Sequence, residues 1–428
     1  MTEQIERRRS LPGPDDTLRV ELDNGIVVLA RENFSSPAVV VDGYLRGGAL
    51  QEPPEKAGLA GFHSALLTRG TRRHTFSELF EEIESNGASL NVDSGSHTYG
   101  FGAKSLAEDL PRMMGLLAEV LREPTFPADH VEKVRGQILT GLKMREDSTR
   151  QMASLTFYEL AYRGHPYAIS SSGYVETVSA ITRDDLVEFH RNLGPRGAII
   201  TVVGAVKPEE AVRIVEQTFG DWQNPEQPEA PLAPDAAPIE DVREKHVIIP
   251  GKSQSDLILG VVGPRRSAPD YQAARMANSI LGVFGMYGRL GDVVRQRQGL
   301  AYYSFSRLSG GLGPGPWQVV AGVPPEKVDL AVELIRDEIR RLLDEPVSAE
   351  ELADNKSFFK GQLVLGLETN EGVSSSILTM ELYGLGLDYL QKYAAITDSI
   401  TADDVQAAAR RYLNPDAYAL AVAGPPAR

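Results

Sequence analysis

The chain has 428 residues, of which 42% are hydrophobic and 24% are charged, and it contains no cysteine. This length predicts two domains of roughly 200 residues each, and the lack of cysteine excludes disulfides, thiolate zinc sites and cysteine nucleophiles. The net charge of −15 disfavours nucleic acid and membrane partners, and no apolar run approaches the roughly 20 residues that cross a bilayer.

The first part of the chain predicts a mobile arm followed by strands and then helices. Residues 1–13 are charged and broken by proline without an apolar stretch, so we expect an arm rather than a secretory signal, and a cytoplasmic location. A hairpin is predicted over 18–29, because Asn24-Gly25 separates two apolar runs. A strand follows over 38–45. Helices are predicted over 57–67, 75–85 and 105–121.

The middle of the chain carries a linker between two similar halves. Residues 223–242 hold five prolines and few large apolar residues, which is typical of an extended linker. The flanking domains, 14–222 and 243–428, repeat one another at a displacement of about 220 residues. The pairs of positions that anchor this repeat are Leu121 with Leu343, Gly136 with Gly361, and Ile181 with Ile400.

These elements predict the fold class. Neighbouring strands are followed by helices instead of alternating strictly with them, which favours an α+β arrangement over a parallel α/β sheet. The sequence therefore predicts two homologous repeats of a mainly antiparallel sheet packed with helices, joined by the proline-rich linker.

The stretch 58–71, GLAGFHSALLTRGT, resembles the G-L-A-H-F-L-E-H-M-L-F-K-G-T stretch of the pitrilysin, insulinase and mitochondrial-processing-peptidase family of zinc peptidases. The resemblance covers nearly the whole chain and implies the LuxS/MPP-like metallopeptidase fold. In the family, H-x-x-E-H places two zinc ligands and a general base on one helix face. Here those positions are Gly61, Ser64 and Ala65, and the third ligand position, a glutamate in the family, is Gly141. The resemblance therefore implies a chain that binds no zinc.

His63 is the one histidine inside this stretch. It lies two residues after the first ligand position, which is about 200° around a helix, and it has no second histidine at metal-binding spacing. We therefore expect a surface or packing histidine, and no cofactor in this chain.

In the second half, residues 295–302, RQRQGLAY, resemble the family pattern L-R-E-k-x-G-L-a-Y. The resemblance implies that Arg295 and Tyr302 reach an active site, because they keep the family's separation. Such groups stabilise the charge that develops on a peptide carbonyl during hydrolysis. The alternative is an arginine and a tyrosine that only pack.

Several other residues resemble parts of the family's substrate-binding surface. Asn91 lies in a strand that binds substrate by edge pairing in the family, although here it could simply hold the sheet edge. Gly282 and Gly288 occupy segments like the family's N-x-x-L-G-G and S-R-L. Gly311 and Gly313 belong to a glycine-rich segment of the kind implicated in holding extended peptides, with a plain long turn as the alternative.

The expected function is that of a noncatalytic subunit in a heterodimeric peptidase. A homologous partner with an intact H-x-x-E-H motif would carry the zinc, and the two chains would close around an extended peptide. The alternative is a zinc-free peptide-binding or scaffold protein that acts alone or as a homodimer. An independent hydrolase is disfavoured because no G-x-S-x-G elbow is present.

Overall fold

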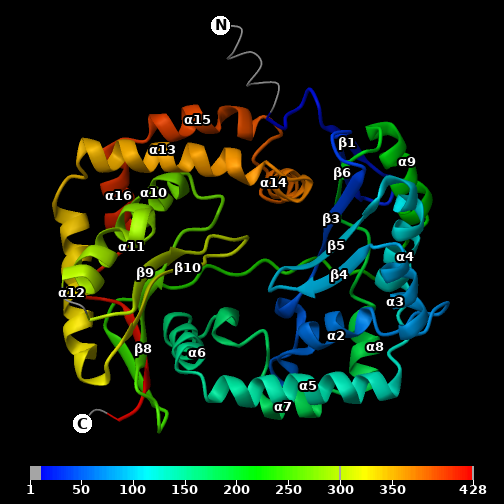
Figure 1. Ribbon diagram of the computed structural model, residues 1–428. Coiled ribbons are helices and arrows are strands. Elements are labelled where there is room, and N and C mark those ends of the chain that lie inside the picture. The colour runs from blue at the N-terminus through cyan, green and yellow to red at the C-terminus, as the bar shows by residue number, and fades with distance from the viewer. Residues whose placement is uncertain (1–10, 298–299, 427–428) are drawn as a thin grey trace, which may run out of the picture. The chain divides into compact units, whose positions relative to one another are not determined.

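The computed structural model describes residues 11–297 and 300–426, with the backbone alone for 295–297 (Figure 1). The chain folds into two compact units. Unit 1 contains the chain up to Gly141, Ser171–Pro231 and Leu363–Tyr393. Unit 2 contains Leu142–Ser170, Leu232–Gln362 and the chain from Ala394 onward.

Unit 1 is built on a six-stranded sheet in the order β1-β2-β6-β3-β5-β4. Its strands are β1 (Leu18–Glu21), β2 (Val27–Glu32), β3 (Ala38–Arg46), β4 (Ser89–Ser94), β5 (Thr98–Leu106) and β6 (Ile199–Gly204). Only β2 and β6 pair in parallel among these strands. The predicted hairpin is confirmed, since β1 and β2 are antiparallel around a turn in which Gly25 has a φ of 86°.

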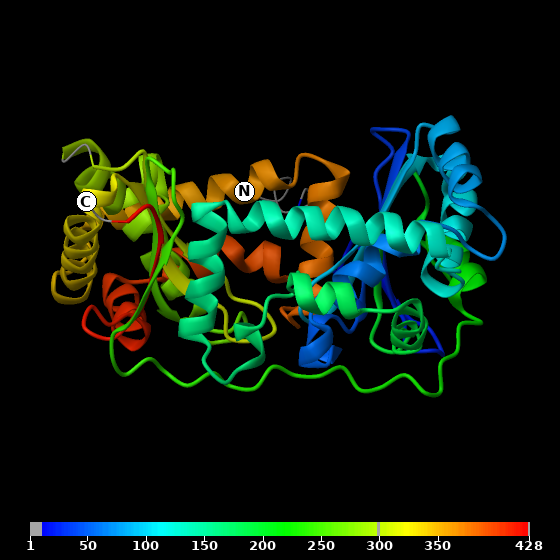
Figure 2. The ribbon, with the colours of Figure 1, turned by 90° about the horizontal axis from the view of Figure 1, so that it is seen from below.

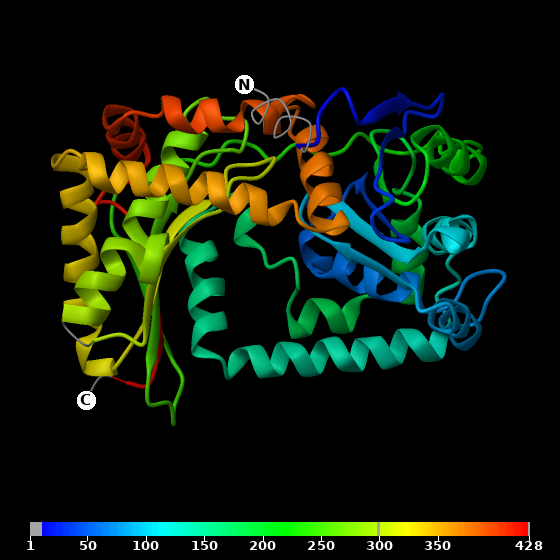
Figure 3. The same ribbon diagram turned by 45° about the horizontal axis from the view of Figure 1, so that its top comes forward.

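Helices cover both faces of this sheet. On one face α4 contacts β5 and α9 contacts β2, while α2 contacts β4 (Figure 1). On the other, α14 packs against β6 and β3 (Figure 3). The helices of unit 1 include α2 (Leu59–Leu67), α3 (Phe76–Ser85), α4 (Leu110–Arg122), α7 (Val175–Ala180), α8 (Arg183–His190), α9 (Pro208–Phe219) and α14 (Asn370–Leu382), and most of α5 (Ala128–Glu146).

The helix predicted over 105–121 begins later than expected. Strand β5 continues to Leu106, because its last residues still pair with the start of β3, where Leu106 lies opposite Ala38. A short 3-10 turn, Ala107–Asp109, then leads into α4. The predicted start at Ser105 is therefore wrong, since that residue is in a strand.

Unit 2 is built on a five-stranded sheet in the order β7-β11-β8-β10-β9. Its strands are β7 (Arg243–Ile248), β8 (Ser255–Val262), β9 (Tyr303–Leu308), β10 (Pro316–Val323) and β11 (Ala419–Gly424). Helix α6 contacts β8 and β11, whereas α10 contacts β9 and α12 contacts β10. The other elements include α6 (Thr149–Ala161), α10 (Tyr271–Gly282), α11 (Phe284–Leu290), η5 (Gly291–Arg297), α12 (Val328–Asp344), α16 (Ala402–Tyr412) and most of α13 (Ala349–Gly366) and α15 (Tyr389–Ser399).

The two sheets share one topology. The order β2-β6-β3-β5-β4 matches β7-β11-β8-β10-β9, and the parallel pair takes the same place in each, β2 with β6 and β7 with β11. The predicted α+β fold of two homologous repeats is therefore confirmed. Between the repeats, residues 223–242 form neither helix nor strand (Figure 2).

The compact units do not coincide with the repeats in the sequence. Helix α6 comes from the first repeat but belongs to unit 2, where Phe157 and Ala153 are buried with Ala421 of β11. Helix α14 comes from the second repeat but belongs to unit 1, where Ile377 is buried with Leu29 of β2. Each compact unit therefore includes a helix that comes from the other repeat.

Among the residues that the structure describes, no helix has both the length and the apolar character that a membrane span requires.

Candidate functional site

Helix α2 stands where the family's metal-binding helix is expected. Its first turn is held by Glu52, whose carboxylate accepts hydrogen bonds from the backbone N–H groups of Gly58 (2.8 Å) and Ala60 (2.6 Å). Burial raises the pKa of Glu52 to about 7, although these hydrogen bonds act in the opposite direction. Glu52 therefore satisfies backbone N–H groups that the start of a helix otherwise leaves without a partner.

The four degenerate ligand positions do not fit a zinc site. Gly61, Ser64 and Ala65 lie on α2, and Gly141 lies on α5. They offer a single side-chain oxygen, that of Ser64, whose hydroxyl donates to the carbonyl of Gly61 at 3.0 Å. Zinc sites in proteins are built from His, Cys, Asp and Glu. Across the described part of the chain, no group of three or more such side chains is arranged to hold a metal.

His63 is a packing histidine, which is one of the two alternatives expected from the sequence. Its side chain is fully buried. Its Nδ1 lies 3.1 Å from the hydroxyl oxygen of Tyr99, and its Nε2 lies 3.1 Å from Nδ1 of His190. Burial lowers the pKa of His63 well below its usual value and lowers that of His190 to about 4. Both hydrogen-bonding nitrogens of His63 are therefore engaged within the core of unit 1.

The expected catalytic pair lies in unit 2. Tyr302 directly precedes β9, and its side chain is 81% exposed. The backbone of Arg295 belongs to η5, but its side chain lies outside the part of the chain that the structure describes. Their expected convergence on an active site therefore stays a prediction.

The next residue, Tyr303, anchors the start of β9. Its hydroxyl donates to the carboxylate of Asp256, which is buried on β8 and also accepts from the hydroxyl of Thr149. The guanidinium of Arg150 lies 5.5 Å from the centre of the Tyr303 ring. In the sequence, the one signal for this cluster is Asp256 itself, a lone carboxylate at the start of the apolar strand SDLILGVV.

Packing explains the glycines at 282 and 288. A Cβ on Gly282 would lie 2.3 Å from the backbone nitrogen of Ser306 on β9. A Cβ on Gly288 would lie 2.5 Å from the carbonyl oxygen of Ile280, and its φ of 58° also favours glycine. The fold therefore brings both residues together at the C-terminal end of α10, but their role in substrate binding stays a prediction.

The glycine-rich segment forms the connection between β9 and β10, and it is tied to its surroundings. The carbonyl of Gly311 accepts a hydrogen bond from the backbone N–H of Arg266 (3.0 Å). The buried Gly313 packs beneath Tyr167, where an added Cβ would lie 2.0 Å from the hydroxyl oxygen. This packing accounts for glycine at 313. Gly311 has open space beside it, so a peptide-holding role is sterically allowed there.

Asn91 lies on β4, an edge strand of the first sheet. It pairs with Gly102 of β5, and its side-chain oxygen lies over that glycine beside the carboxylate of Asp42. Burial raises the pKa of Asp42. Asn91 itself is exposed, which leaves its side chain accessible to a ligand.

Comparison with known proteins decides the family. The profile of insulinase, peptidase family M16, matches residues 27–173, and the profile of the peptidase M16 inactive domain matches residues 180–358. Together they span both repeats. The chain belongs to peptidase family M16. This M16 chain lacks the H-x-x-E-H motif.

Relatives of this M16 chain include proteases and a respiratory-complex subunit. An uncharacterized zinc protease of Streptomyces coelicolor is 28% identical over 92% of this chain and 87% of its own length. Subunit 1 of the human mitochondrial cytochrome b-c1 complex is 28% identical over 61% of this chain and 54% of its own. The crystal structure of a peptidase M16 inactive domain from Pseudomonas fluorescens superposes with a TM-score of 0.89 at 26% identity, covering 96% of this chain and 98% of that one.

The degenerate ligand positions on α2 and α5 lead to a direct prediction about metal content. The purified M16 chain should contain no stoichiometric zinc and show no chelator-sensitive peptidase activity, because its ligand positions are Gly, Ser, Ala and Gly. Elemental analysis after dialysis measures this. A positive control is the chain carrying G61H, S64E, A65H and G141E, since a Cβ on Gly61 or Gly141 would meet no atom closer than 3.7 Å. One tightly bound zinc in the unchanged chain, lost in His63→Asn, would contradict the prediction.

Proposed function

We propose that this chain is the noncatalytic subunit of a heterodimeric M16 metallopeptidase. One observation carries the proposal: the chain keeps the fold of family M16 through both repeats while every zinc-ligand position has lost its ligand. A chain with this fold but without zinc ligands can still take part in peptide cleavage when a second chain binds the zinc. The partner would be a homologous chain with an intact H-x-x-E-H motif.

Tyr302 and Arg295 are the groups that this chain would contribute to the partner's site. A peptide carbonyl gains negative charge as hydrolysis proceeds, and a preorganised hydroxyl or guanidinium stabilises that charge. The exposure of Tyr302 supports this role, because its hydroxyl is free to meet another molecule. The anchored neighbour Tyr303 supports it further, because it fixes the start of β9 directly after Tyr302.

The substrate in this proposal is an extended peptide. Edge strands recognise such peptides through their unpaired backbone groups, and β4 and β9 are both edges. Asn91 lies on the first edge, and Gly311 follows the second in the β9–β10 connection. Gly282, Gly288 and Gly313 shape the backbone around β9 in this view.

A second function has one observation in its favour. The resemblance to subunit 1 of the cytochrome b-c1 complex supports a zinc-free peptide-binding or scaffold protein, alone or as a homodimer. In that function Tyr302 and Arg295 would have no catalytic effect, so the change in kcat when they are replaced distinguishes the two proposed functions.

The proposal is tested by reconstituting the pair with an H-x-x-E-H-bearing M16 chain from the same genome. Tyr302→Phe deletes only a hydroxyl, and loss of one oxyanion donor costs on the order of 100- to 1000-fold in rate. We therefore expect kcat to fall by at least about tenfold, with assembly on size exclusion unchanged. Arg295→Ala should act likewise. The matched control Tyr412→Phe removes a hydroxyl that is bonded to Asp270 instead (3.0 Å), and should leave kcat unchanged.

If kcat is unchanged in both Tyr302→Phe and Arg295→Ala, the pair is structural and the scaffold function becomes the better proposal. The same holds if no H-x-x-E-H-bearing chain forms a complex with this one.

A further inference from the structure

A cavity of about 400 Å³ lies in unit 1 beside the loop that follows α2. The loop runs over 69–75, and the N-terminal turns of α3 and α5 complete the walls. The basic side chains that line the cavity are Arg69, Arg72, Arg73, His74 and His130. Three arginines around one cavity stand out in a chain whose net charge is −15.

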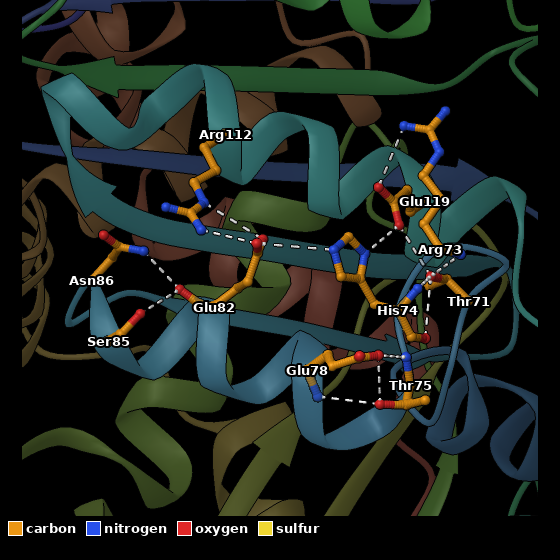
Figure 4. A network of polar contacts seen from close by, with 10 residues as sticks. All are labelled: Thr71, Arg73, His74, Thr75, Glu78, Glu82, Ser85, Asn86, Arg112 and Glu119. Carbon is orange, nitrogen blue, oxygen red and sulfur yellow. Dashed lines mark hydrogen bonds and ion pairs between the residues drawn. The ribbon is translucent and has the colours of Figure 1, made fainter.

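A polar network fixes the loop in place (Figure 4). Glu119 of α4 is buried and accepts the hydroxyl of Thr71 at 3.0 Å, and it lies 2.8 Å from Nδ1 of His74. Arg73 approaches the same carboxylate at 3.6 Å. His74 and Arg73 are therefore engaged, and the loop needs no ordering when a ligand enters, which lowers the entropic cost of binding.

Two of the other lining cations have no carboxylate partner. Among the residues that the structure describes, neither Arg69 nor Arg72 forms an ion pair. The guanidinium of Arg69 lies 4.9 Å from the centre of the Phe76 ring, and its Nε donates weakly to the carbonyl of Ala65 at 3.4 Å. The terminal nitrogens of the Arg69 guanidinium are therefore available to other groups.

His130 also lines the cavity, and it carries an unsatisfied polar atom. Its Nδ1 is buried and has no hydrogen-bond partner. Its ring packs against Phe76 with the ring centres 5.1 Å apart, so Phe76 supports both this imidazole and the guanidinium of Arg69. Buried polar atoms are almost always hydrogen-bonded in folded proteins. The imidazole of His130 therefore has hydrogen-bonding capacity that the described protein does not use.

Two carboxylates also line the cavity. Glu78 is occupied as the cap of α3, where it accepts the N–H and the hydroxyl of Thr75 at 2.8 Å each, and these bonds lower its pKa. Asp129 lies in the first turn of α5 and opposes an incoming anion. Its removal should strengthen anion binding, which distinguishes a binding site from a merely structural cluster.

We propose that this cavity binds a tetrahedral oxyanion of the phosphate class, either free phosphate or the phosphate of a small monoester. Arg69 and Arg72 supply the charge, and the imidazole of His130 supplies a hydrogen bond. Donors from three side chains match the several oxygens of a tetrahedral anion better than the two oxygens of a planar carboxylate. The site is independent of peptide handling and of any partner chain.

The test is isothermal titration of the full chain with sodium phosphate and with glycerol 3-phosphate, at an ionic strength held constant with sodium chloride. We expect saturable binding of at least one of them, weakened about tenfold by Arg69→Gln or Arg72→Gln and strengthened severalfold by Asp129→Asn. Arg213→Gln removes the same charge from an exposed i,i+3 pair on α9 and should leave the affinity unchanged.

The two ligands distinguish the source of the phosphate group: tighter binding of the monoester identifies an ester, and equal or tighter binding of phosphate identifies the free ion. Arg72 is exposed, so Arg72→Gln stays informative if Arg69→Gln disturbs the packing on Phe76. The absence of saturable binding of both ligands would overturn the proposal. An equal loss of affinity in Arg213→Gln would overturn it too, because binding would then follow net charge alone.

Discussion

Phe157→Ala should destabilise unit 2 by about 3–5 kcal/mol, although residue 157 belongs to the first repeat. Its ring is fully buried on α6, in the cluster that also holds Ile258 of β8 and Ala421 of β11. Truncation leaves a cavity in that core, and the surrounding strands relax only partly into it. Helix α6 belongs to unit 2, and the unit 1 cluster that holds Leu29 and Ile377 includes no residue of α6, so unit 1 should keep its own stability.

The two tryptophans of the chain make this measurable, since Trp222 lies in unit 1 and Trp317 in unit 2. In a Trp222→Phe background, the urea midpoint reported by Trp317 should fall in Phe157→Ala. In a Trp317→Phe background, Ile377→Ala on α14 should lower the urea midpoint reported by Trp222. The corresponding loss in the free energy of unfolding of unit 1 should be about 2–5 kcal/mol. The two substitutions thus serve as reciprocal controls.

If both tryptophans report one shared transition, hydrogen exchange separates the units instead. Amides of β8 and β11 should exchange faster in Phe157→Ala, and those of β2 and β6 should not. Faster exchange confined to β2 and β6 would show that α6 stabilises the sheet of its own repeat.

This exchange of helices marks the limit of what the sequence could predict about the fold. The linker, the hairpin at Asn24-Gly25 and the duplication follow from local patterns and from similarity between the halves. Apolar periodicity shows that α6 and α14 each bury a face. Periodicity does not show which sheet each helix packs against, because both sheets offer the same kind of apolar surface and share one topology.

In the candidate site, too, the features with a local sequence signal are predictable and the contacts made by packing are not. The loss of ligands at Gly61, Ser64 and Ala65 is visible in the sequence, because the motif has fixed spacing on one helix. One hydrogen-bond partner of His63 is His190, which lies 127 residues further on and is brought into contact by packing of α2 with α8. Partners this distant leave no local signal.

The pair His63 and His190 also makes unit 1 sensitive to acid. Aromatic rings surround His63, with the centres of Tyr99, Phe126 and Phe189 at 5.5, 5.3 and 5.7 Å. One arrangement of protons satisfies every donor. The Tyr99 hydroxyl, which also lies 3.2 Å from the carbonyl oxygen of Ala60, donates to His63 Nδ1. His63 Nε2–H then donates to His190 Nδ1, and His190 Nε2–H donates to the carbonyl of Arg122. Both imidazoles are neutral in this arrangement.

The stability of unit 1 should therefore fall as the pH drops below about 6.5, the usual pKa of histidine. The unfolded chain takes up a proton at His190 near that pH, while the folded chain does so only near its pKa of about 4. Within this window the unfolded state binds more protons, so stability decreases with decreasing pH. At about 1.4 kcal/mol per pKa unit, His190 alone should cost about 2 kcal/mol at pH 5. His63, whose pKa is also lowered, acts in the same direction.

Glu52 acts in the opposite direction, because its raised pKa gives the folded state the extra proton between about 4.5 and 7. The histidine effect is therefore measured as a difference between the unchanged chain and His190→Asn, whose amide reaches His63 without titrating. Between pH 7.5 and pH 5, the unchanged chain should lose about 2 kcal/mol more than the variant in urea unfolding followed by Trp222. His246→Asn, on β7 of unit 2, is the matched control and should leave this loss unaltered. Parallel pH profiles for the unchanged chain and His190→Asn would mean that His190 takes up its proton at the same pH in the folded and unfolded protein, and the buried, neutral hydrogen-bonded chain from Tyr99 to Arg122 would then be wrong.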